Sequence, residues 1–259
     1  MGDTIGFVPT MGALHAGHLT LATIALTECD ICVVSIFVNP KQFAPHEDFD
    51  RYPRMLGVDA ELLGAIGVQA IFAPSVEVMY PHGFQTSVTV GDVSKPLEGE
   101  FRPHFFTGVA TVVTRFLLQV GAHKAFFGEK DFQQLQVIKA LQHDLAIPTE
   151  IVGVPTIREG SGLALSSRNA YLTPAQKDIA TTLHKTLLTM AEKYRSGVAI
   201  ADIDAWGAQQ LLQNGFEKID YITLRDAATL NTPSADSKDL RILAAAWLGT
   251  TRLIDNIAV

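Results

Sequence analysis

Cysteine is scarce in this chain of 259 residues, which has two, Cys29 and Cys32, spaced C-x-x-C. That spacing suits a redox pair or half of a zinc site, but the sequence has no second cysteine pair to complete a zinc site. The pair falls where a helix is expected to end and a buried strand to begin, and small apolar residues are common there. We therefore interpret both as structural cysteines in a reducing compartment.

Long hydrophobic runs and an excess of positive charge are also missing. No apolar run reaches the roughly 18 residues that a membrane helix needs, and the first residues carry no basic segment of the kind that opens a signal peptide. Lys and Arg total 20 against 27 Asp and Glu, and the net charge of −7 argues against general nucleic-acid binding. We expect a cytoplasmic protein whose partners are small molecules, with no nucleic acid and no membrane.

What the sequence does have is alternation of strand and helix patterns over its first part. Apolar residues make up 47% of the chain, enough for a sizeable core. The alternation predicts an α/β fold, a Rossmann-like doubly wound parallel sheet, with ligands bound beyond the carboxyl ends of the strands. After a first strand ending at Pro9, strands are expected over 31–38, 70–74, 86–90, 125–128 and 150–154, and helices over 54–66, 108–120 and 131–144.

The pattern changes after about Arg158. Thr173 and Pro174 suit the N-cap and first position of a long helix ending near Gly197. A second helix is expected over 201–214, followed by a strand over 220–224 and two apolar runs. We predict a Rossmann-like domain over 1–157 and a smaller C-terminal α+β lid domain over 158–259, with an antiparallel sheet and a hinge at Gly160–Gly162.

The stretch 7–21, FVPTMGALHAGHLTL, predicts a strand, a glycine turn and a helix from about Ala13. His15 and His18 are three residues apart, so both rings would lie on one face in the first turns of the helix. The N-terminus of a helix favours phosphate, and two imidazoles there can donate to a phosphoryl group. The alternative is a pair of surface histidines on an amphipathic helix.

Two later stretches add polar groups suited to a nucleotide. Gly128 lets a ligand approach the backbone, Lys130 supplies positive charge, and Asp131 can accept from ribose hydroxyls. The run 165–168, LSSR, offers hydroxyls, backbone N–H groups and a guanidinium that suits phosphate oxygens. Each stretch alone would equally fit a solvated turn.

Five stretches together resemble one family. HAGH at 15–18 resembles the H-x-G-H signature of a nucleotidyltransferase superfamily related to class I aminoacyl-tRNA synthetases. The set resembles the pantothenate synthetase family in order and spacing: 7–21, 38–43 (VNPKQF), 52–54 (YPR), 127–134 (FGEKDFQQ) and 162–169 (GLALSSRN). The resemblance implies an amide-forming ligase that condenses (R)-pantoate with β-alanine, using ATP as a substrate with Mg²⁺. The reaction would pass through pantoyl adenylate and release pyrophosphate and AMP.

The resemblance also implies roles for particular residues. His18 would be the proton donor, acting with His15, Lys130 and Arg168. Gln42 and Gln134 would bind pantoate, and Gln42 also β-alanine, whose carboxylate has Tyr52 and Arg102 as candidates. Asp59 could help to hold Mg²⁺, although an aspartate on a helix surface is the favoured interpretation. The implied ATP site comprises Met11, Gly12, Ala13, Leu14, His15, Ala16, Gly17, His18, Gly128, Glu129, Lys130, Asp131, Ile157, Leu165, Ser166, Ser167 and Arg168.

The sequence departs from the family pattern in two places. Relatives usually have a helix before the first strand, and they read R-P-G-H-F-x-G where this chain has RPHFFTG over 102–108. Phe105 therefore stands at the position of their histidine, and His104 at that of their glycine. Relatives are typically homodimers, so we expect one here. Two alternatives stay open: a nucleotidyltransferase with another acceptor, and a nucleotide-binding regulator without turnover.

Overall fold

The computed structural model describes residues 2–45 and 47–259, and the chain divides into two compact units. Unit 1 holds the chain up to Lys95 together with Arg102–Glu129 and Gln133–Pro155. Unit 2 holds Pro96–Phe101, Lys130–Phe132 and Thr156–Val259. Each unit has its own sheet.

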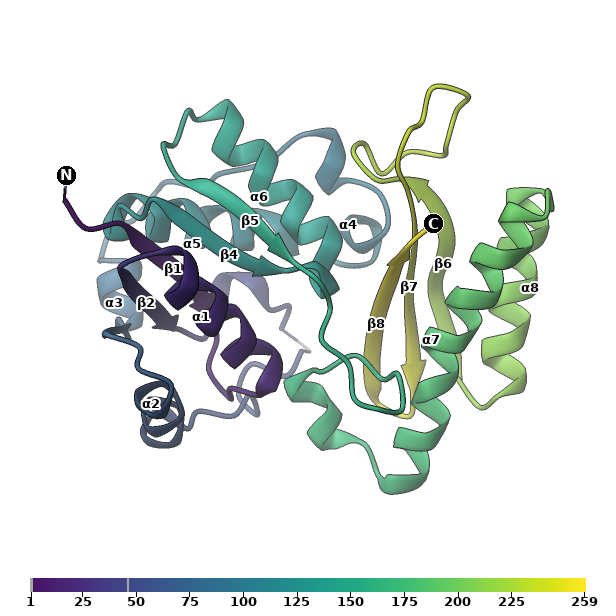
Figure 1. Ribbon diagram of the computed structural model, residues 1–259, viewed down its shortest axis with the longest axis horizontal. Coiled ribbons are helices and arrows are strands. Elements are labelled where there is room, and N and C mark those ends of the chain that lie inside the picture. Colours follow the sequence, from purple (N-terminus) through teal and green to yellow (C-terminus); the bar gives the residue numbers. More distant parts are fainter. Residues whose placement is uncertain (1, 46) are drawn as a thin grey trace. The chain divides into compact units, whose positions relative to one another are not determined.

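Unit 1 is built on a five-stranded parallel sheet with the strand order β3-β2-β1-β4-β5 (Figure 1). Because the chain starts in the centre and winds outward first to one side and then to the other, the predicted doubly wound, Rossmann-like fold is confirmed. The strands are β1 (Ile5–Thr10), β2 (Ile31–Ile36), β3 (Ala70–Phe72), β4 (Lys124–Gly128) and β5 (Glu150–Val154).

Helices cover both faces of this sheet, and side-chain alternation along β1 divides the core between them. Phe7 packs with residues of α5 (Phe105–Val120) and α6 (Phe132–Asp144). Its neighbour Val8 packs with α1 (Ala16–Glu28) and α2 (Leu56–Ala65) on the opposite face. A parallel sheet buried on both faces explains why its strands read as apolar runs. A short helix, α3 (Val76–Met79), follows β3.

The central strands separate toward their carboxyl ends. β1 pairs with β2 along its whole length, from Ile5 to Thr10. With β4 it pairs only at Gly6–Lys124 and Phe7–Ala125. Loops therefore leave β1 and β4 from the switch point of the sheet, the position where doubly wound folds bind ligands.

The strand expected over 86–90 does not form. The Val88 N–H donates to Thr111 Oγ1 of α5 at 2.9 Å, and Val88 and Val90 pack against the core between the sheet and α5. The apolar alternation therefore correctly predicts that Val88 and Val90 are at least partly buried. The prediction of a neighbouring strand as hydrogen-bonding partner is wrong, because that partner is the helix α5.

Unit 2 has the predicted antiparallel sheet, in the order β6-β7-β8. Its strands are β6 (Lys218–Asp226), β7 (Leu240–Leu248) and β8 (Thr251–Ala258), and its main helices are α7 (Pro174–Arg195) and α8 (Ile200–Gln213). The local signals at the start of α7 work as expected: Thr173 Oγ1 accepts from the Gln176 N–H at 3.2 Å, and Pro174 follows the cap. The apolar faces of this sheet and of α7 and α8 form one core, which is separate from the cores of unit 1.

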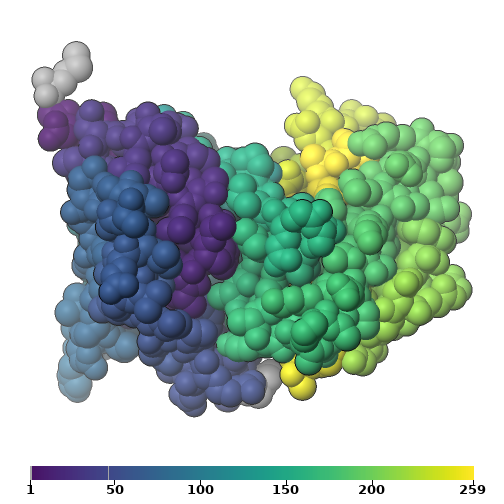
Figure 2. Space-filling model, turned by 60° about the horizontal axis from the view of Figure 1, so that its bottom comes forward, coloured from purple at the N-terminus to yellow at the C-terminus, as the bar shows by residue number. Residues whose placement is uncertain are grey.

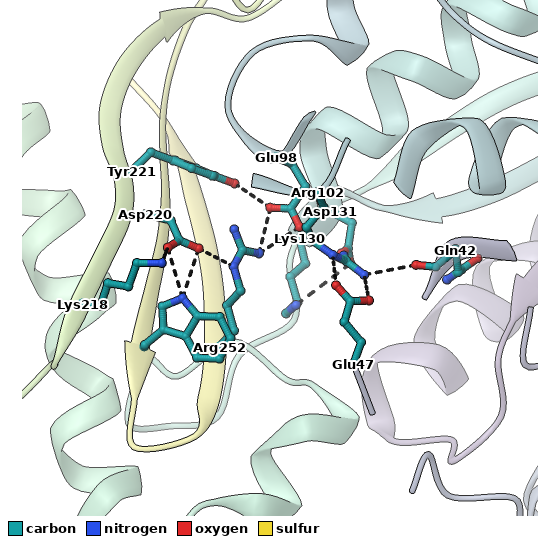
Figure 3. A network of polar contacts seen from close by, with 11 residues as sticks. Gln42, Glu47, Glu98, Arg102, Lys130, Asp131, Lys218, Asp220, Tyr221 and Arg252 are labelled. Atoms are coloured by element: carbon teal, nitrogen blue, oxygen red, sulfur yellow. Dashed lines mark hydrogen bonds and ion pairs between the residues drawn. The ribbon is translucent and has the colours of Figure 1, made fainter. Parts of the chain in front are cut away.

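A cluster of buried charges ties the short helix α4 (Glu98–Phe101) into unit 2 (Figure 3). Arg252 of β8 contacts Glu98 at 2.8 Å and Asp220 of β6 at 2.7 Å, and these side chains are 14%, 8% and 2% exposed. Tyr221 Oη also donates to Glu98 at 3.3 Å. Such burial is tolerable because each charge has an opposite partner in direct contact.

The expected hinge at Gly160–Gly162 is wrong in position, because these residues form a closed hairpin inside unit 2. The Glu159 N–H donates to the Leu163 carbonyl, and the Gly162 N–H to the Glu159 carbonyl. Arg158 fixes the hairpin to β8 through a double hydrogen bond to Asp255 at 2.7 and 2.8 Å. The chain passes from unit 1 to unit 2 for the last time between Pro155 and Thr156.

The structural interpretation of the two cysteines fits their surroundings. Cys32 is fully buried in the core beneath α1, and burial raises its pKa to about 11. Cys29 ends α1, its N–H donating to the Ala25 carbonyl at 2.9 Å, and burial raises its pKa as well. Among residues 2–45 and 47–259, no helix is long and apolar enough to cross a membrane.

Candidate active site

The loop after β1 is held by a buried carboxylate. Asp59 Oδ2 accepts from the Ala13 N–H at 2.9 Å, and Oδ1 from the Leu14 N–H at 2.8 Å. Gly12 and Ala13 both have left-handed backbone, with φ of 82° and 51°. A Cβ on Gly12 would lie 2.9 Å from Asp59 Oδ2, so the loop needs both the glycine and the aspartate.

This geometry corrects the expectation for Asp59. α2 lies on the outside of unit 1 (blue in Figure 2), but of its ten residues Asp59 and Leu63 are buried, and Asp59 is 1% exposed. Asp59 is therefore not a surface residue. Both its oxygens accept backbone N–H groups, so it is a poor candidate to hold Mg²⁺.

The two histidines form the start of α1, which begins at Ala16, later than expected because Gly12 and Ala13 cannot be helical. His15 is the N-cap, with Nδ1 accepting from the Gly17 N–H at 3.1 Å, and His18 Nδ1 accepts from the His15 N–H at 3.4 Å. The ring centroids are 4.0 Å apart. Because each Nδ1 is an acceptor, each neutral ring carries its proton on Nε2. The pair thus places two imidazole rings at a helix N-terminus, a position that favours phosphate.

Gln42, at the end of the 3-10 turn η1 (Pro40–Gln42), lies next to the same loop. Its Nε2 contacts Met11 Sδ at 3.0 Å, and its Oε1 accepts from Asn39 Nδ2 at 3.0 Å. The structure therefore brings together two residues of the predicted site, Met11 and Gln42, that are far apart in sequence.

Arg102 is also brought to Gln42. One of its Nη2 hydrogen bonds reaches the Gln42 carbonyl at 3.2 Å. The guanidinium is paired with Glu47 through Nε–Oε1 and Nη2–Oε2 contacts, both 2.6 Å (Figure 3). Phe105 lies under the guanidinium, 3.9 Å from carbon to ring centroid. Arg102 is thus held in one orientation by a carboxylate and an aromatic ring.

The remaining predicted residues of unit 1 occupy different surroundings. Tyr52 is buried and meets Phe43 edge-on, with 6.0 Å between ring centroids. Gln134 is half-buried in the first turn of α6. Gly128 ends β4, and Glu129 begins the turn η3 (Glu129–Asp131) that follows it.

In unit 2, Asn256 of β8 contacts two segments that carry other predicted ATP ligands. Asn256 Nδ2 donates to the Lys130 carbonyl at 2.9 Å, and Lys130 Nζ is 4.0 Å from Asp131. The Asn256 carbonyl accepts from Arg158 Nη2 at 3.2 Å. Beside Arg158, the Ile157 carbonyl accepts from the Leu165 N–H at 3.0 Å. Lys130, Ile157 and Leu165 therefore lie on segments anchored to a single strand.

The LSSR stretch leads into the turn η4 (Ser167–Tyr171). Ser166 caps it, its Oγ accepting from the Arg168 N–H at 3.2 Å. Asn169 Nδ2 donates to the Ala164 carbonyl at 3.0 Å, which fixes the loop from below. Ser166, Ser167 and Arg168 are half-buried. Side chains of the loop therefore hold its own backbone.

A family model described as Pantoate-beta-alanine ligase matches residues 1–258 of this chain. The chain belongs to the pantoate–β-alanine ligase family. Pantothenate synthetase of Paramagnetospirillum magneticum is 53% identical over 258 residues, covering 100% of this chain and 91% of that protein. Pantothenate synthetase of Rhodospirillum rubrum is 50% identical over 259 residues, covering 100% and 92%.

Solved structures give the same family. The crystal structure of Thermus thermophilus pantothenate synthetase is similar, with a TM-score of 0.93 and 46% identity, over 98% of this chain and 92% of that one. The Francisella tularensis pantoate–β-alanine ligase, described as complexed with βγ-ATP and β-alanine, has a TM-score of 0.83 and 36% identity, over 99% and 90%. The fold and the resemblance inferred from the sequence motifs are thereby confirmed.

Phe105 is the clearest feature in which this member departs from the pattern expected of pantoate–β-alanine ligases. Its ring supports the Arg102 guanidinium by stacking, a role that needs a flat ring and no proton. His104 is exposed at the N-cap of α5 and makes no side-chain capping bond.

Sequence reasoning missed three contributors to the site: the loop-holding role of Asp59, the pairing of Glu47 with Arg102, and the contacts of Asn39. A signal existed for Asp59, which lies four residues before the buried Leu63 and so on the inward face of α2. Nothing in the sequence marks Glu47, because its partner lies 55 residues away.

Proposed function

We propose that this chain catalyses the ATP-dependent condensation of (R)-pantoate with β-alanine to pantothenate, releasing pyrophosphate and AMP. The observation that carries the proposal is the pair of imidazoles at the N-terminus of α1 in a chain of the pantoate–β-alanine ligase family. The Francisella tularensis relative, described with βγ-ATP and β-alanine bound, supports ATP and β-alanine as substrates.

The first step is adenylation. A pantoate carboxylate oxygen attacks the α-phosphorus of ATP, the bond from that phosphorus to the bridging oxygen breaks, and pyrophosphate leaves. A carboxylate is already nucleophilic, so no catalytic serine or cysteine is required. The difficulty is charge on the phosphoryl oxygens, which preorganised donors stabilise. We assign this work to His18 as proton donor and to His15, Lys130 and Arg168. In the ATP site these act with residues of the loop after β1, of 128–131 and of 165–168, and with the Ile157 backbone.

The second step forms the amide. The β-alanine amine attacks the carbonyl carbon of pantoyl adenylate, the carbon–oxygen bond to AMP breaks, and the amine gives up a proton. We assign pantoate to Gln42 and Gln134, and the β-alanine carboxylate to Arg102 with Tyr52. Arg102 is already paired with Glu47, so a substrate carboxylate would have to share or displace that partner.

Mg²⁺ is proposed to arrive with ATP as part of the substrate, because a triphosphate supplies the oxygen ligands this ion prefers. Among residues 2–45 and 47–259, no group of three or more His, Cys, Asp or Glu side chains is placed to hold a metal ion.

Adenylates hydrolyse in water, so we propose that unit 2 closes as a lid during the reaction. Small-angle scattering should report a smaller radius of gyration with ATP and pantoate bound, and an unchanged radius would contradict closure. The homodimer and the cytoplasmic location stay predictions, tested by light scattering and by cell fractionation.

The test of the function is a stepwise assay. With ATP and pantoate alone, the enzyme should release pyrophosphate in a burst of about one equivalent, and AMP should follow only when β-alanine is added. Turnover with another acid, or nucleotide binding without pyrophosphate release, would refute the proposal. A His18→Ala variant that keeps full activity would refute the assignment of that residue alone.

A further inference from the structure

The amide of Asn39 is buried, 1% exposed, and all its hydrogen-bonding atoms are used. Its Oδ1 accepts from Tyr80 Oη at 2.6 Å and from the Lys41 N–H at 3.2 Å. Its Nδ2 donates to the Gly108 carbonyl at 3.2 Å and to Gln42 Oε1 at 3.0 Å. An amide end that meets a hydroxyl and an N–H is therefore the oxygen, and the end that meets two acceptors is the nitrogen.

Tyr80, Asn39 and Gln42 form a relay of side-chain hydrogen bonds, with Tyr80 at one end. The Tyr80 hydroxyl keeps its proton at neutral pH, since burial raises its pKa to about 12, an effect that the charge of Arg115 only partly offsets. The protonated hydroxyl donates to Asn39 Oδ1 beside the Lys41 N–H, and the Gly108 carbonyl accepts from Asn39 Nδ2. Together these groups keep Asn39 Nδ2 turned toward Gln42. Gln42 must then present its oxygen to Asn39 and its NH₂ group to Met11.

At the other end of the relay, the side-chain NH₂ group of Gln42 meets a poor acceptor, the sulfur of Met11. Gln42 Nε2 lies 3.0 Å from Met11 Sδ, and a thioether sulfur accepts hydrogen bonds weakly. The NH₂ group therefore loses little when it exchanges the sulfur for an oxygen. A hydroxy acid offers such oxygens in its carboxylate and its hydroxyl, whereas a reversed amide would face them with its own oxygen.

We propose that Tyr80 is a positioning residue that, together with the Lys41 N–H and the Gly108 carbonyl, holds the Asn39 amide and so fixes which end of the Gln42 amide faces the bound acid. The inference rests on the proposed function for the identity of that acid, pantoate. It makes Tyr80 a determinant of specificity for an oxygen acceptor at this position, acting through Asn39 and Gln42.

The direct test is Tyr80→Phe, which removes the hydroxyl and keeps the ring that packs against Phe37 and Phe84. Loss of one neutral hydrogen bond predicts a KM for pantoate raised about 3- to 10-fold. The KM for ATP should change less than twofold. Tyr221→Phe, the same chemical change in unit 2, is the matched control and should leave both KM values unchanged. An unchanged pantoate KM in Tyr80→Phe would overturn the proposal.

A double-mutant cycle separates positioning from general loosening of the fold. In a Gln42→Ala background the relay lacks the side-chain amide that would face the acid. Tyr80→Phe should therefore produce no further rise in the pantoate KM. An equal rise in both backgrounds would show that Tyr80 acts in some other way and would overturn the proposal.

A readout without turnover keeps this test separate from the proposed function. The side-chain NH₂ resonances of Gln42, assigned by their loss in Gln42→Ala, should shift in Tyr80→Phe and stay in place in Tyr221→Phe. Unshifted resonances would contradict the relay even in an active enzyme. An enzyme that fails to adenylate pantoate but shows the shift would refute the function and retain the relay.

Discussion

Replacing Asp59 by alanine would remove the acceptor that holds the loop after β1. Two backbone N–H groups, of Ala13 and Leu14, would lose their partner. An unsatisfied buried donor costs about 1–3 kcal/mol, and both residues are half-buried, so water can reach part of the loop. We therefore expect a loss of about 2–4 kcal/mol in the free energy of unfolding of unit 1. Asp59→Asn keeps one carbonyl oxygen and should lose about half as much.

Thermal unfolding followed by far-UV circular dichroism measures this loss. At about 2–4 °C per kcal/mol, Asp59→Ala should lower the midpoint by about 5–15 °C. Both tryptophans, Trp206 and Trp247, lie in unit 2, so their fluorescence follows that unit separately. The matched control is Glu61→Ala, which removes an exposed carboxylate from the same helix.

Relaxation of the loop after β1 should also change the KM for ATP. Gly12 and Ala13 would leave their left-handed conformation, whose strain the Asp59 contacts now offset. The KM for ATP should then rise at temperatures where the variant is still folded. If Asp59→Ala unfolded at the same temperature as Glu61→Ala and kept the wild-type KM for ATP, the reasoning about this loop would be wrong.

Three further predictions concern packing and buried charge. Gly108→Ala should displace η1, because the added Cβ would overlap the Lys41 carbonyl, and the pantoate KM should rise by more than tenfold; a wild-type value would refute this packing argument. Arg252→Met should cost about 3–5 kcal/mol in urea unfolding followed by tryptophan fluorescence, because Glu98 and Asp220 lose their shared cation; a loss below about 1 kcal/mol would contradict it. Burial would raise the pKa of Asp220, but hydrogen bonds from Arg252 and Lys218 outweigh it and lower that pKa. The resulting stability is present above the unfolded pKa of about 3.9 and is lost as pH falls through the lower folded value. Trp247 fluorescence should therefore report a smaller loss of stability below about pH 4 in Asp220→Asn than in wild type, and identical profiles would count against the assignment.

Most of the fold can be predicted from local patterns in the sequence. The apolar runs of β1 and β2, the Thr173–Pro174 start of α7 and the glycine end of α5 each depend on residues a few positions apart, so the sequence contains the whole signal. The HAGH stretch likewise predicted the paired imidazoles, because N-cap chemistry is local.

Two predictions are wrong, the strand over 86–90 and the hinge at Gly160–Gly162. Both segments depend on contacts with residues far away in the sequence. Whether the 86–90 segment forms a strand depends on what lies beside it, and Thr111 of α5 takes the hydrogen bond that a neighbouring strand would have made. The glycines at 160 and 162 predict a hinge, but the Arg158–Asp255 pair holds this hairpin, and those two residues lie 97 positions apart in the sequence. Partners so distant in sequence leave no periodic pattern.

The central claim, that a carboxylate attacks the α-phosphorus of ATP held by the paired imidazoles, can be tested by isotope transfer. Pantoate labelled with ¹⁸O in its carboxylate should deliver one labelled oxygen to the phosphoryl group of AMP as pantothenate forms. AMP that carries no label while labelled pantothenate accumulates would contradict the adenylate route.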